Sequence, residues 1–321
     1  MKAICQYRYG SPDVLELRDI EAPAIGDDGV LVRVAAASVN PLDWHLMRGE
    51  PYLVRMMFGL RRPKGSRPGV DVAGRVEAVG ANVTGLRAGD EVFGGCDGAF
   101  AEYASGKEKN LVRKPAGLTF EEAAAVPIAG CTALQAIRDL GEVQPGQTVL
   151  INGAAGGVGT FAVQIARAFG ADVTGVCSTG NLDMVRSIGA NQVIDYTVED
   201  FTRAGRLYDL ILDLVGNRSM SDLRRALTPR GTAILAGGGG GRLLGPMAQM
   251  LGSRILTRFV SQRLVMFIAK LNGKDLLVLA ELIEAGKVKP VVDRTYPLDE
   301  TATAIRYLEA RHARGKVVVT V

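Results

Sequence analysis

The sequence predicts an α/β protein with two domains, a β-rich domain followed by a doubly wound parallel sheet. Its 321 residues are enough for two hydrophobic cores. Short strand-like runs between turn residues extend to about residue 104, and helices alternate with apolar strands after about residue 121. A composition of 47% hydrophobic and 22% charged residues excludes a disordered chain.

Residues 1–123 are expected to form the β-rich domain. The apolar runs Val30–Val34, Val72–Val76 and Glu91–Phe93 stand between Gly, Pro and Asp residues that favour turns. The stretch Gly69–Gly80, with the sequence GVDVAGRVEAVG, has glycines where strands bend or bulge. These patterns predict an irregular β-domain.

Residues 124–285 are expected to form the parallel sheet, and residues 286–321 to return to the first domain as strand, helix and strand. The predicted strands are 148–151, 172–177, 192–194, 210–214 and 233–236. Helices are predicted over 157–169, 181–188 and 275–284, with an edge strand over 262–269. This alternation is typical of parallel strands with helices on both faces.

The strongest local signal is the segment Gly153–Gly159, GAAGGVG, which joins a predicted strand to a predicted helix. It matches the Rossmann fingerprint with Ala154 in place of the first glycine. Gly156 lets a pyrophosphate approach, Gly159 packs helix on strand, and the helix amino end offers N–H groups and positive charge. The predicted contacts are Ala155, Gly156, Gly157 and Val158. A glycine-rich turn without a ligand is the alternative.

The end of the next predicted strand favours NADPH over NADH. An NAD site usually has an acid about 20 residues beyond the glycines, which holds the ribose 2′-hydroxyl. Here the segment reads VCSTGN, and no acid appears until Asp183. Ser178, Thr179 and Asn181 can donate hydrogen bonds to a 2′-phosphate, which a carboxylate would repel. These residues also suit the cap of the next helix, and both roles can hold together.

The net charge and the cysteine spacing indicate which binding partners and which cellular location to expect. The net charge of +4 is small and evenly spread, so nucleic-acid binding is not expected. Cys5, Cys96, Cys131 and Cys177 have no CxxC spacing, which predicts neither a zinc lobe nor a disulfide framework. The chain has no secretory apolar core at its start and no run of about 18 apolar residues, so a cytoplasmic protein is expected.

Several motifs in one order resemble the medium-chain dehydrogenase/reductase superfamily. They are NPLDW at 40–44, GVDVAGRVEAVG, AGDEVFG at 88–94, GAFAEYA at 98–104, AAVPIAGCTALQA at 124–136, GAAGGVG, and HARGKVVV at 312–319. Within it, the chain is most similar to the zinc-independent NADPH:quinone oxidoreductases and enone reductases. The resemblance covers nearly the whole chain. It implies a GroES-like β-rich catalytic domain, a Rossmann domain, and a cleft between them for NADPH and substrate.

The zinc ligands of the superfamily's alcohol dehydrogenases are absent from the matching positions. Asn40 stands where those enzymes have a cysteine, and Val70 and Asp71 stand where they have His-Glu. Valine cannot ligate zinc, and an amide is a poor ligand beside thiolate or imidazole. No metal site is therefore expected, and alcohol oxidation loses its Lewis acid. Quinones and α,β-unsaturated carbonyls remain suitable hydride acceptors, because the negative charge that the hydride brings delocalises onto their oxygen.

The resemblance implies that Asn40 and Asp43 are cleft residues, with Asn40 donating an amide N–H to the substrate oxygen and Asp43 orienting that region. Tyr52 is a further catalytic candidate, because its phenol can donate to a carbonyl oxygen. The alternatives are an ordinary turn for Asn40 and Asp43, and a packed or exposed aromatic for Tyr52.

On the cofactor side, the resemblance places Thr132 beside the nicotinamide and Tyr196 near the 2′-phosphate. Gly216 follows the fourth predicted strand, and Ala236 and Gly237 follow the fifth, where open α/β sheets bind ligands. Thr132 also suits an ordinary helix hydroxyl, and the five glycines from residue 237 suit a simple turn. Asn181 departs from the lysine that the family often has at its position.

The apolar stretch 241–270 carries five basic residues. A membrane-surface helix that collects lipophilic quinones is one interpretation. Gly and Pro interrupt the stretch, which favours a lid over the substrate and a subunit edge. A paired edge strand at 263–269 predicts a homodimer.

Three functions are compatible with these patterns. The leading hypothesis is an NADPH-dependent, zinc-independent reductase of quinones or enones. The second is a reductase of another lipid-like carbonyl. The third is a non-catalytic NADPH-binding sensor, because a fold alone does not determine a function.

Overall fold

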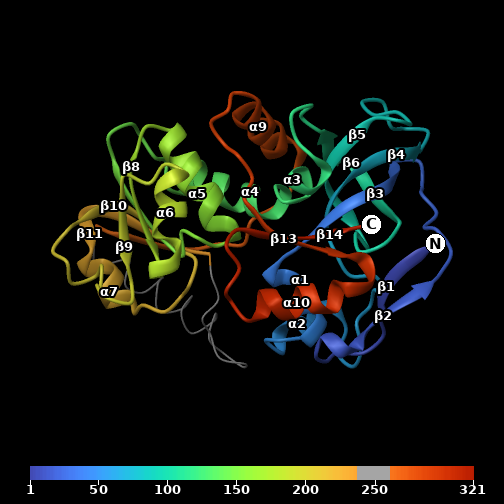
Figure 1. Ribbon diagram of the computed structural model, residues 1–321, viewed down its shortest axis with the longest axis horizontal. Helices are drawn as coiled ribbons and strands as arrows, with labels where there is room; N and C mark the ends of the chain where they lie inside the picture. Colours follow the sequence, from blue (N-terminus) through green and yellow to red (C-terminus); the bar gives the residue numbers. More distant parts are fainter. Residues whose placement is uncertain (237–260) are drawn as a thin grey trace. The chain divides into compact units, whose positions relative to one another are not determined.

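The structure is a computed structural model that describes residues 1–236 and 261–321 (Figure 1). The chain forms two compact units. The first unit contains residues 1–131, 270–285 and 290–321, and the second contains the described part of 132–269 together with 286–289. The first is rich in antiparallel strands and the second contains a parallel sheet, so the predicted α/β class is confirmed.

The first unit is built on a six-stranded sheet with the order β13-β14-β3-β4-β5-β6. Its neighbours are antiparallel except β13 and β14, and β3 also pairs with β6, which closes strands β3 to β6 on themselves. Strands β1 and β2 form a separate antiparallel pair. The bounds are β1 Lys2–Gln6, β2 Leu15–Asp19, β3 Gly29–Val39, β4 Asp71–Val79, β5 Glu91–Asp97, β6 Tyr103–Arg113, β13 Val292–Pro297 and β14 Lys316–Thr320.

Valine alternation and one close glycine contact explain how β3 and β4 pair. Val30, Val32 and Val34 are buried in β3 while the residues between them are not, as expected for a strand with one face on a core. A Cβ at Gly74 would lie 2.1 Å from the Arg33 carbonyl oxygen, so only glycine fits there. The pairing register shifts nearby, between Val34 and Ala36, which agrees with the irregularity that the glycine-rich sequence predicts.

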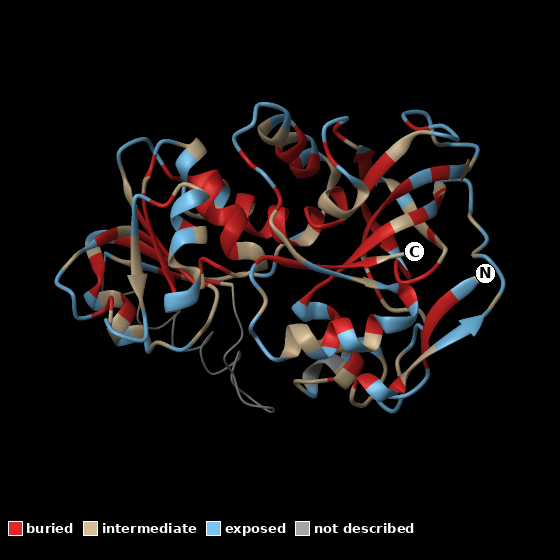
Figure 2. Cartoon of the chain, viewed as in Figure 1, coloured by how far each residue is buried: buried red, intermediate tan, exposed pale blue. Residues whose placement is uncertain are grey.

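Short helices complete the first unit. Helix α10 packs against β13 and β14, and α1 packs against α10. The buried residues in Figure 2 follow the strands, with valines and alanines contributing most of the core. The bounds are η1 Pro12–Val14, α1 Pro41–Arg48, α2 Leu53–Phe58, α3 Phe120–Ala124, α9 Gly273–Glu284, η4 Leu298–Glu300 and α10 Thr301–Glu309.

The second unit contains a parallel sheet with the order β12-β11-β10-β7-β8-β9. The chain starts at β7, winds outward through β8 and β9, and then continues on the other side of β7, which is the doubly wound order of a dinucleotide-binding sheet. The strands are β7 Thr148–Asn152, β8 Asp172–Cys177, β9 Gln192–Asp195, β10 Tyr208–Asp213, β11 Leu227–Leu235 and β12 Arg263–Met266. The helices are η2 Gln135–Leu140, α5 Gly157–Ala168, η3 Thr179–Asn181, α6 Leu182–Ser187 and α7 Met220–Arg225.

The division into units differs from the expected boundaries at three places. The sequence analysis began the second domain at residue 124, whereas helix α4 (Pro127–Leu134) crosses the observed boundary after Cys131. It also placed residues 270–285 with the parallel sheet, whereas this segment groups with the first unit. The reason is packing, because α9 lies against β6, and the Leu279 side chain lies close to Gly130 of the first unit. Of the segment 286–321 that was expected to return to the first domain, residues 290–321 group with the first unit and 286–289 with the second.

Candidate functional site

The predicted cofactor residues of the second unit gather at one edge of the parallel sheet. Since parallel strands share a direction, the segments that follow their carboxyl ends lie at the same edge. These residues are Ala155, Gly156, Gly157 and Val158 after β7, Ser178, Thr179 and Asn181 after β8, Tyr196 after β9, Gly216 after β10 and Ala236 after β11. Thr132 is buried in α4 and has a polar partner. Gly237 lies outside the described residues.

The glycine loop has the geometry that a bound pyrophosphate requires. Gly153 has a φ of +89°, and its N–H donates to the Val176 carbonyl at 3.1 Å. A Cβ at Gly156 would meet only the Gly153 oxygen, at 3.4 Å, so this side of the loop is open. A Cβ at Gly159 would lie 2.1 Å from the same oxygen, so the helix packs closely on the turn. The first N–H groups of α5 have no acceptor within the helix and suit an anionic group.

Asp213, at the carboxyl end of β10, is a candidate that the sequence analysis did not single out. It pairs in register with Asn152 of β7, and its Oδ1 accepts from the Asn152 amide at 2.9 Å and from the Gly216 N–H at 3.0 Å. Its Oδ2 is buried and has no hydrogen-bond partner in the described structure. A buried carboxylate oxygen without a donor is costly, and a hydroxyl or carboxamide of a bound dinucleotide fits this need. The signal in the sequence was the aspartate that ends a strand in DLILD.

In the segment after β8, the hydroxyl hydrogens of Ser178 and Thr179 differ in whether they already have an acceptor. The Thr179 hydroxyl donates to Asp195 Oδ2 at 2.5 Å, so its hydrogen is already used. The Asn181 amide donates to the Ser178 hydroxyl oxygen at 3.1 Å, which leaves the Ser178 hydrogen available. Hydrogen bonds from Thr179 and Thr197 hold the pKa of Asp195 below its usual value. Ser178 is therefore the best-placed donor of this segment, and Asp195 is a carboxylate near it that the sequence analysis overlooked.

A second polar constellation, which we call the buried cluster, lies inside the first unit. It consists of Ser38, Asn40, Asp43, Asp71 and Lys316, and each is at most 3% exposed. The Lys316 ammonium lies 2.6 Å from Asn40 Oδ1 and 3.6 Å from Asp71 Oδ2. Asp71 Oδ2 also accepts from the Ser38 hydroxyl and the Asn40 amide, both at 2.9 Å.

The buried cluster uses the hydrogen-bonding groups of Asn40 within the protein. Its amide nitrogen donates to Asp71 and, at 3.3 Å, to the Ser38 carbonyl, and its amide oxygen accepts from Lys316. Asp43 accepts from the backbone N–H of Asn40 at 2.7 Å, which fixes the first turn of α1. A substrate oxygen would therefore compete with partners that Asn40 already has.

Burial changes the ionisation of the buried cluster. It raises the pKa of Asp43 to about 7, because the carboxyl group has lost its hydration. It also raises the pKa of Asp71 and lowers the pKa of Lys316, while the pair and its hydrogen bonds oppose both shifts. Asp71 accepts three hydrogen bonds, including one from the Ile128 N–H, and faces the Lys316 ammonium, so this pair is ionised.

Tyr52 differs from Asn40 and Asp43 because it lies on the surface of the first unit. It precedes α2, and the Arg55 guanidinium lies 4.9 Å from the centre of its ring. Its side chain is 45% exposed. The structure therefore groups Asn40 with Asp43 and leaves Tyr52 outside the buried cluster.

Two family models match the chain. One, described as "Alcohol dehydrogenase GroES-like domain", matches residues 26–116, and one described as "Zinc-binding dehydrogenase" matches residues 188–319. The 2-methylene-furan-3-one reductase of Solanum lycopersicum is 36% identical over 99% of this chain and 79% of its own length. The chloroplastic NADPH-dependent alkenal/one oxidoreductase of Arabidopsis thaliana has the same identity and coverage. The Escherichia coli quinone oxidoreductase solved with NADPH superposes with a TM-score of 0.85 at 26% identity, over all of both chains.

The chain belongs to the quinone and enone reductase branch of the medium-chain dehydrogenase/reductase superfamily. The expected GroES-like domain and Rossmann sheet are thereby confirmed. Among the residues that the structure describes, none of the helices combines the length and apolar character that crossing a bilayer requires. All four cysteines are buried free thiols, as expected from their spacing.

The side chains at the superfamily's zinc position do not fit a zinc ion in this member. Asn40 and Asp71 face the Lys316 ammonium, and Val70 offers no donor atom. Within the described ranges, no group of three or more His, Cys, Asp or Glu residues is arranged to hold a metal. A cation already occupies the position between the amide and the carboxylate, and it belongs to the protein. The sequence identified the missing ligands, but Lys316, from the other end of the chain, could not be connected to them.

Proposed function

We propose that this protein is an NADPH-dependent reductase that transfers hydride to quinones or α,β-unsaturated carbonyls without a catalytic metal. The observation that carries the proposal is the combination of an open dinucleotide loop with a zinc position held by Lys316. The alkenal/one oxidoreductase and quinone oxidoreductase activities printed for its relatives support the same class.

The residues that would hold the cofactor belong to the second unit. The backbone of Ala155–Val158 and the amino end of α5 would bind the pyrophosphate, and Asp213 Oδ2 would accept from a cofactor hydroxyl or carboxamide. When bound, NADPH supplies a hydride and the protein supplies orientation and polarity. Thr132, Gly216, Ala236 and Gly237 stay predicted contacts of the nicotinamide half.

The preference for NADPH over NADH rests on Ser178. Its available hydroxyl hydrogen suits a 2′-phosphate, with Asn181 holding the hydroxyl in place and Tyr196 predicted beside it. Thr179 contributes less than the sequence suggested, because its hydrogen serves Asp195. Asp195 opposes the preference, since its carboxylate would repel the phosphate.

The acceptor class follows from the available chemistry. A saturated ketone or an alcohol needs a Lewis acid or a strong general acid, and the zinc position offers neither in a fitting arrangement. A quinone or enone places the incoming charge on oxygen and needs only a hydrogen-bond donor and a proton. Tyr52 is the proposed donor because its phenol is exposed, while Asn40 and Asp43 are proposed to fix the α1 turn that precedes it.

The test is the oxidation of NADPH, followed by absorbance, with panels of quinones, enones and saturated ketones, together with the reduction of NADP⁺ by a panel of alcohols. We expect turnover with quinones or enones, slower reaction with NADH, and no loss of activity after treatment with a zinc chelator. Activity that disappears with zinc removal and returns with zinc would overturn the metal-free proposal. Product analysis separates reduction of a C=C bond from reduction of another lipid-like carbonyl. Tight NADPH binding without turnover on any panel would favour the non-catalytic sensor.

The expected assembly and setting stay predictions. Strand β12 lies at the edge of the parallel sheet and is followed by Ile268, which is 93% exposed, so pairing of two copies at this edge would produce the predicted homodimer. Most of the apolar stretch predicted as a lid or membrane-surface helix falls in residues 237–260, outside the described structure. A cytoplasmic location is likewise a prediction from the sequence. The alkenal/one oxidoreductase of Arabidopsis thaliana is chloroplastic.

A further inference from the structure

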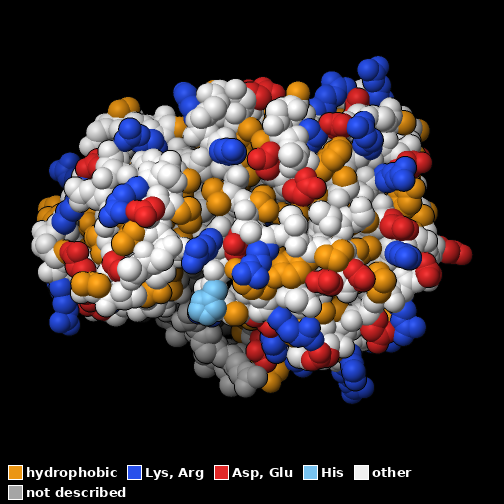
Figure 3. Space-filling model, in the orientation of Figure 1, with side chains coloured by type: hydrophobic (Ala, Val, Ile, Leu, Met, Phe, Trp, Pro, Cys, Tyr) orange, Lys and Arg blue, Asp and Glu red, His pale blue; other side chains and the backbone are white. Residues whose placement is uncertain are grey.

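One segment of the first unit is far more basic than the chain as a whole. Residues 51–67, PYLVRMMFGLRRPKGSR, contain four Arg, one Lys and no acid. This charge exceeds the net +4 of the entire protein, so the charge is not evenly spread as the sequence analysis expected. On the face shown in Figure 3, by contrast, positive and negative side chains are widely interspersed. A local excess of this size favours an anionic ligand.

The basic residues of this segment are mostly available to a ligand. Arg55 donates to the Gly49 carbonyl and stacks on Tyr9 and Tyr52. Arg61, Arg62 and Lys64 are exposed and have no ion-pair partner within the described part of the chain.

The same segment exposes large apolar side chains just before its basic residues. They are Tyr52 at 45%, Met56 at 69%, Phe58 at 43% and Leu60 at 74% exposed. An amphiphile with an anionic end would contact such a surface twice, with its apolar part on the exposed apolar side chains and its anionic end on the unpaired cations.

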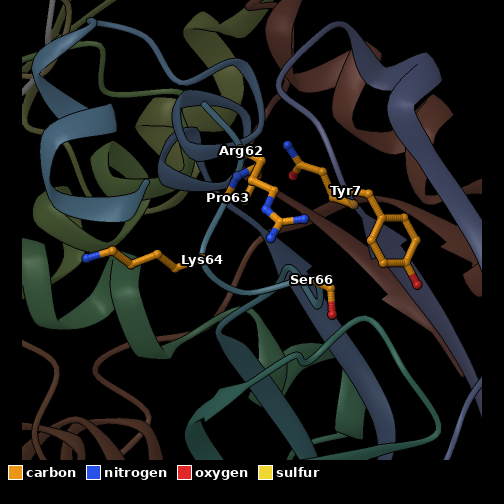
Figure 4. Close-up of a pocket in the computed structure, with 6 residues that line it drawn as sticks. Tyr7, Arg62, Pro63, Lys64 and Ser66 are labelled. Atoms are coloured by element: carbon orange, nitrogen blue, oxygen red, sulfur yellow. The ribbon is translucent and has the colours of Figure 1, made fainter. Parts of the chain in front are cut away.

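A pocket lies where this segment meets the end of β1. Its volume is about 410 Å³, and it is lined by Gln6, Tyr7, Arg62, Pro63, Lys64 and Ser66. Figure 4 shows the Arg62 guanidinium directed toward the side on which Tyr7 and Ser66 lie, whereas the Lys64 side chain extends away from them. Of the two cations that line the pocket, Arg62 is therefore the one directed toward the other lining side chains.

Backbone and side-chain hydrogen bonds hold the walls of this pocket in place. The Gln6 N–H donates to the Ser66 carbonyl at 2.7 Å, which joins β1 to the basic segment. The Gln6 side chain is buried and donates to the Met47 carbonyl at 2.8 Å. The turn closes through the Lys64 N–H, which donates to the Phe58 carbonyl at 2.7 Å, and the Tyr9 hydroxyl donates to the Gly59 carbonyl at 2.6 Å.

We propose that this pocket binds the phosphate group of an amphiphilic phosphate ester, with Arg62 as the principal contact. A guanidinium can donate two parallel hydrogen bonds to phosphate oxygens. The exposed side chains of Met56, Phe58 and Leu60 would contact the alkyl part. The site is separate from the glycine loop, because it lies in the first unit and uses none of the residues proposed for the dinucleotide.

The test is calorimetric titration with decyl phosphate below its micelle concentration, with inorganic phosphate and decanol as matched ligands. We expect decyl phosphate to bind more tightly than either. Arg62→Gln should weaken binding at least tenfold. Arg61→Gln removes the same charge from the adjacent residue, which does not line the pocket, and should weaken binding less than threefold. Equal losses in the two variants, or equal binding of decanol, would overturn the proposal, because diffuse charge or apolar contact alone would then explain binding. Unchanged thermal unfolding of both variants establishes that they fold.

Two further arms identify the source of the phosphate and exclude the dinucleotide loop. Arg62-dependent sedimentation with phosphatidic acid vesicles, but not with phosphatidylcholine vesicles, supports the proposal with a lipid headgroup as the source. Binding of decyl phosphate alone supports it with a free phosphate ester, and binding in neither arm overturns it. The Gly156→Asp variant should retain decyl phosphate binding, and its loss there would mean that the ligand occupies the glycine loop. None of these readouts requires reductase activity, so failure of the proposed function would be visible separately.

Discussion

The glycine loop and the buried cluster are both polar, yet they treat their hydrogen-bonding groups in opposite ways. The first N–H groups of α5 at the loop, and the Ser178 hydrogen and Asp213 Oδ2 at the same edge of the sheet, have no partners in the described structure. The buried cluster pairs Asn40, Asp71 and Lys316 with one another. Unused donors and acceptors indicate where a ligand binds, whereas satisfied ones indicate what holds the fold. This difference separates Ser178 from Asn40, which the sequence had put forward alike as site candidates.

The largest expected effect tests whether the buried cluster is structural. Lys316→Met leaves the Asp71 carboxylate buried without its cation, which should lower the free energy of unfolding by about 3–5 kcal/mol. The double variant with Asp71→Asn should recover part of this loss, because no buried charge remains unpaired. Urea unfolding of the whole chain measures both. Lys107→Met, an exposed lysine, is the matched control and should change stability by less than about 0.5 kcal/mol.

Asp43 gives the buried cluster a specific pH dependence. Its pKa is about 7 in the folded protein against an ordinary value of 3.8, so the folded state binds a proton that the unfolded state releases between these values. The protonated Asp43 contributes up to about 4 kcal/mol to the free energy of unfolding. This contribution is fully present below about pH 4 and is lost as the pH rises through 7. Asp43→Asn should remove this component. Unfolding curves from pH 4 to 8 should then be flatter for the variant, and parallel curves would contradict the assignment.

Gly156→Asp tests the open side of the glycine loop. A carboxylate there would meet the pyrophosphate, so NADPH binding should weaken by roughly 100-fold or more, about 2.7 kcal/mol. Gly156→Ala is the matched control, since its Cβ would lie 3.4 Å from the Gly153 carbonyl oxygen and can be accommodated. Fluorescence titration with NADPH measures both variants. Retained binding in Gly156→Asp would remove the loop from the cofactor site.

The smallest effect distinguishes donors within the segment after β8. Ser178→Asp should shift the NADPH/NADH affinity ratio toward NADH by roughly tenfold, about 1.4 kcal/mol, because it replaces an available donor with a negative charge. Thr179→Val should change the ratio by less than about threefold, since that hydroxyl already serves Asp195. Competition titrations with both cofactors give the ratios. If the two substitutions had equal effects, the available hydrogen of Ser178 would not determine the preference.

The sequence predicted the second unit better than the site in the first. Strands 172–177 and 148–151 and the helix from Gly157 were correct within a residue or two, because a buried parallel strand, a glycine turn and a helix each leave a local pattern. The segment 270–285 was assigned to the other domain because its helical pattern says nothing about which core buries its apolar face. Asp195 was missed for a similar reason. It is 16 residues from Thr179 in the sequence, and the two side chains meet only because β8 pairs with β9.

The α/β class, the glycine turn between β7 and α5 and the missing zinc ligands could be predicted from the sequence alone, because each depends on residues that are neighbours in the chain. Only the tertiary structure decided that Lys316 contacts Asn40 across 276 positions of sequence, and that Asp213 keeps an oxygen without a partner. The physical reason is that hydrogen bonds and burial depend on distance in space. Whether a polar side chain is available to a ligand therefore becomes visible only when its neighbours are in place.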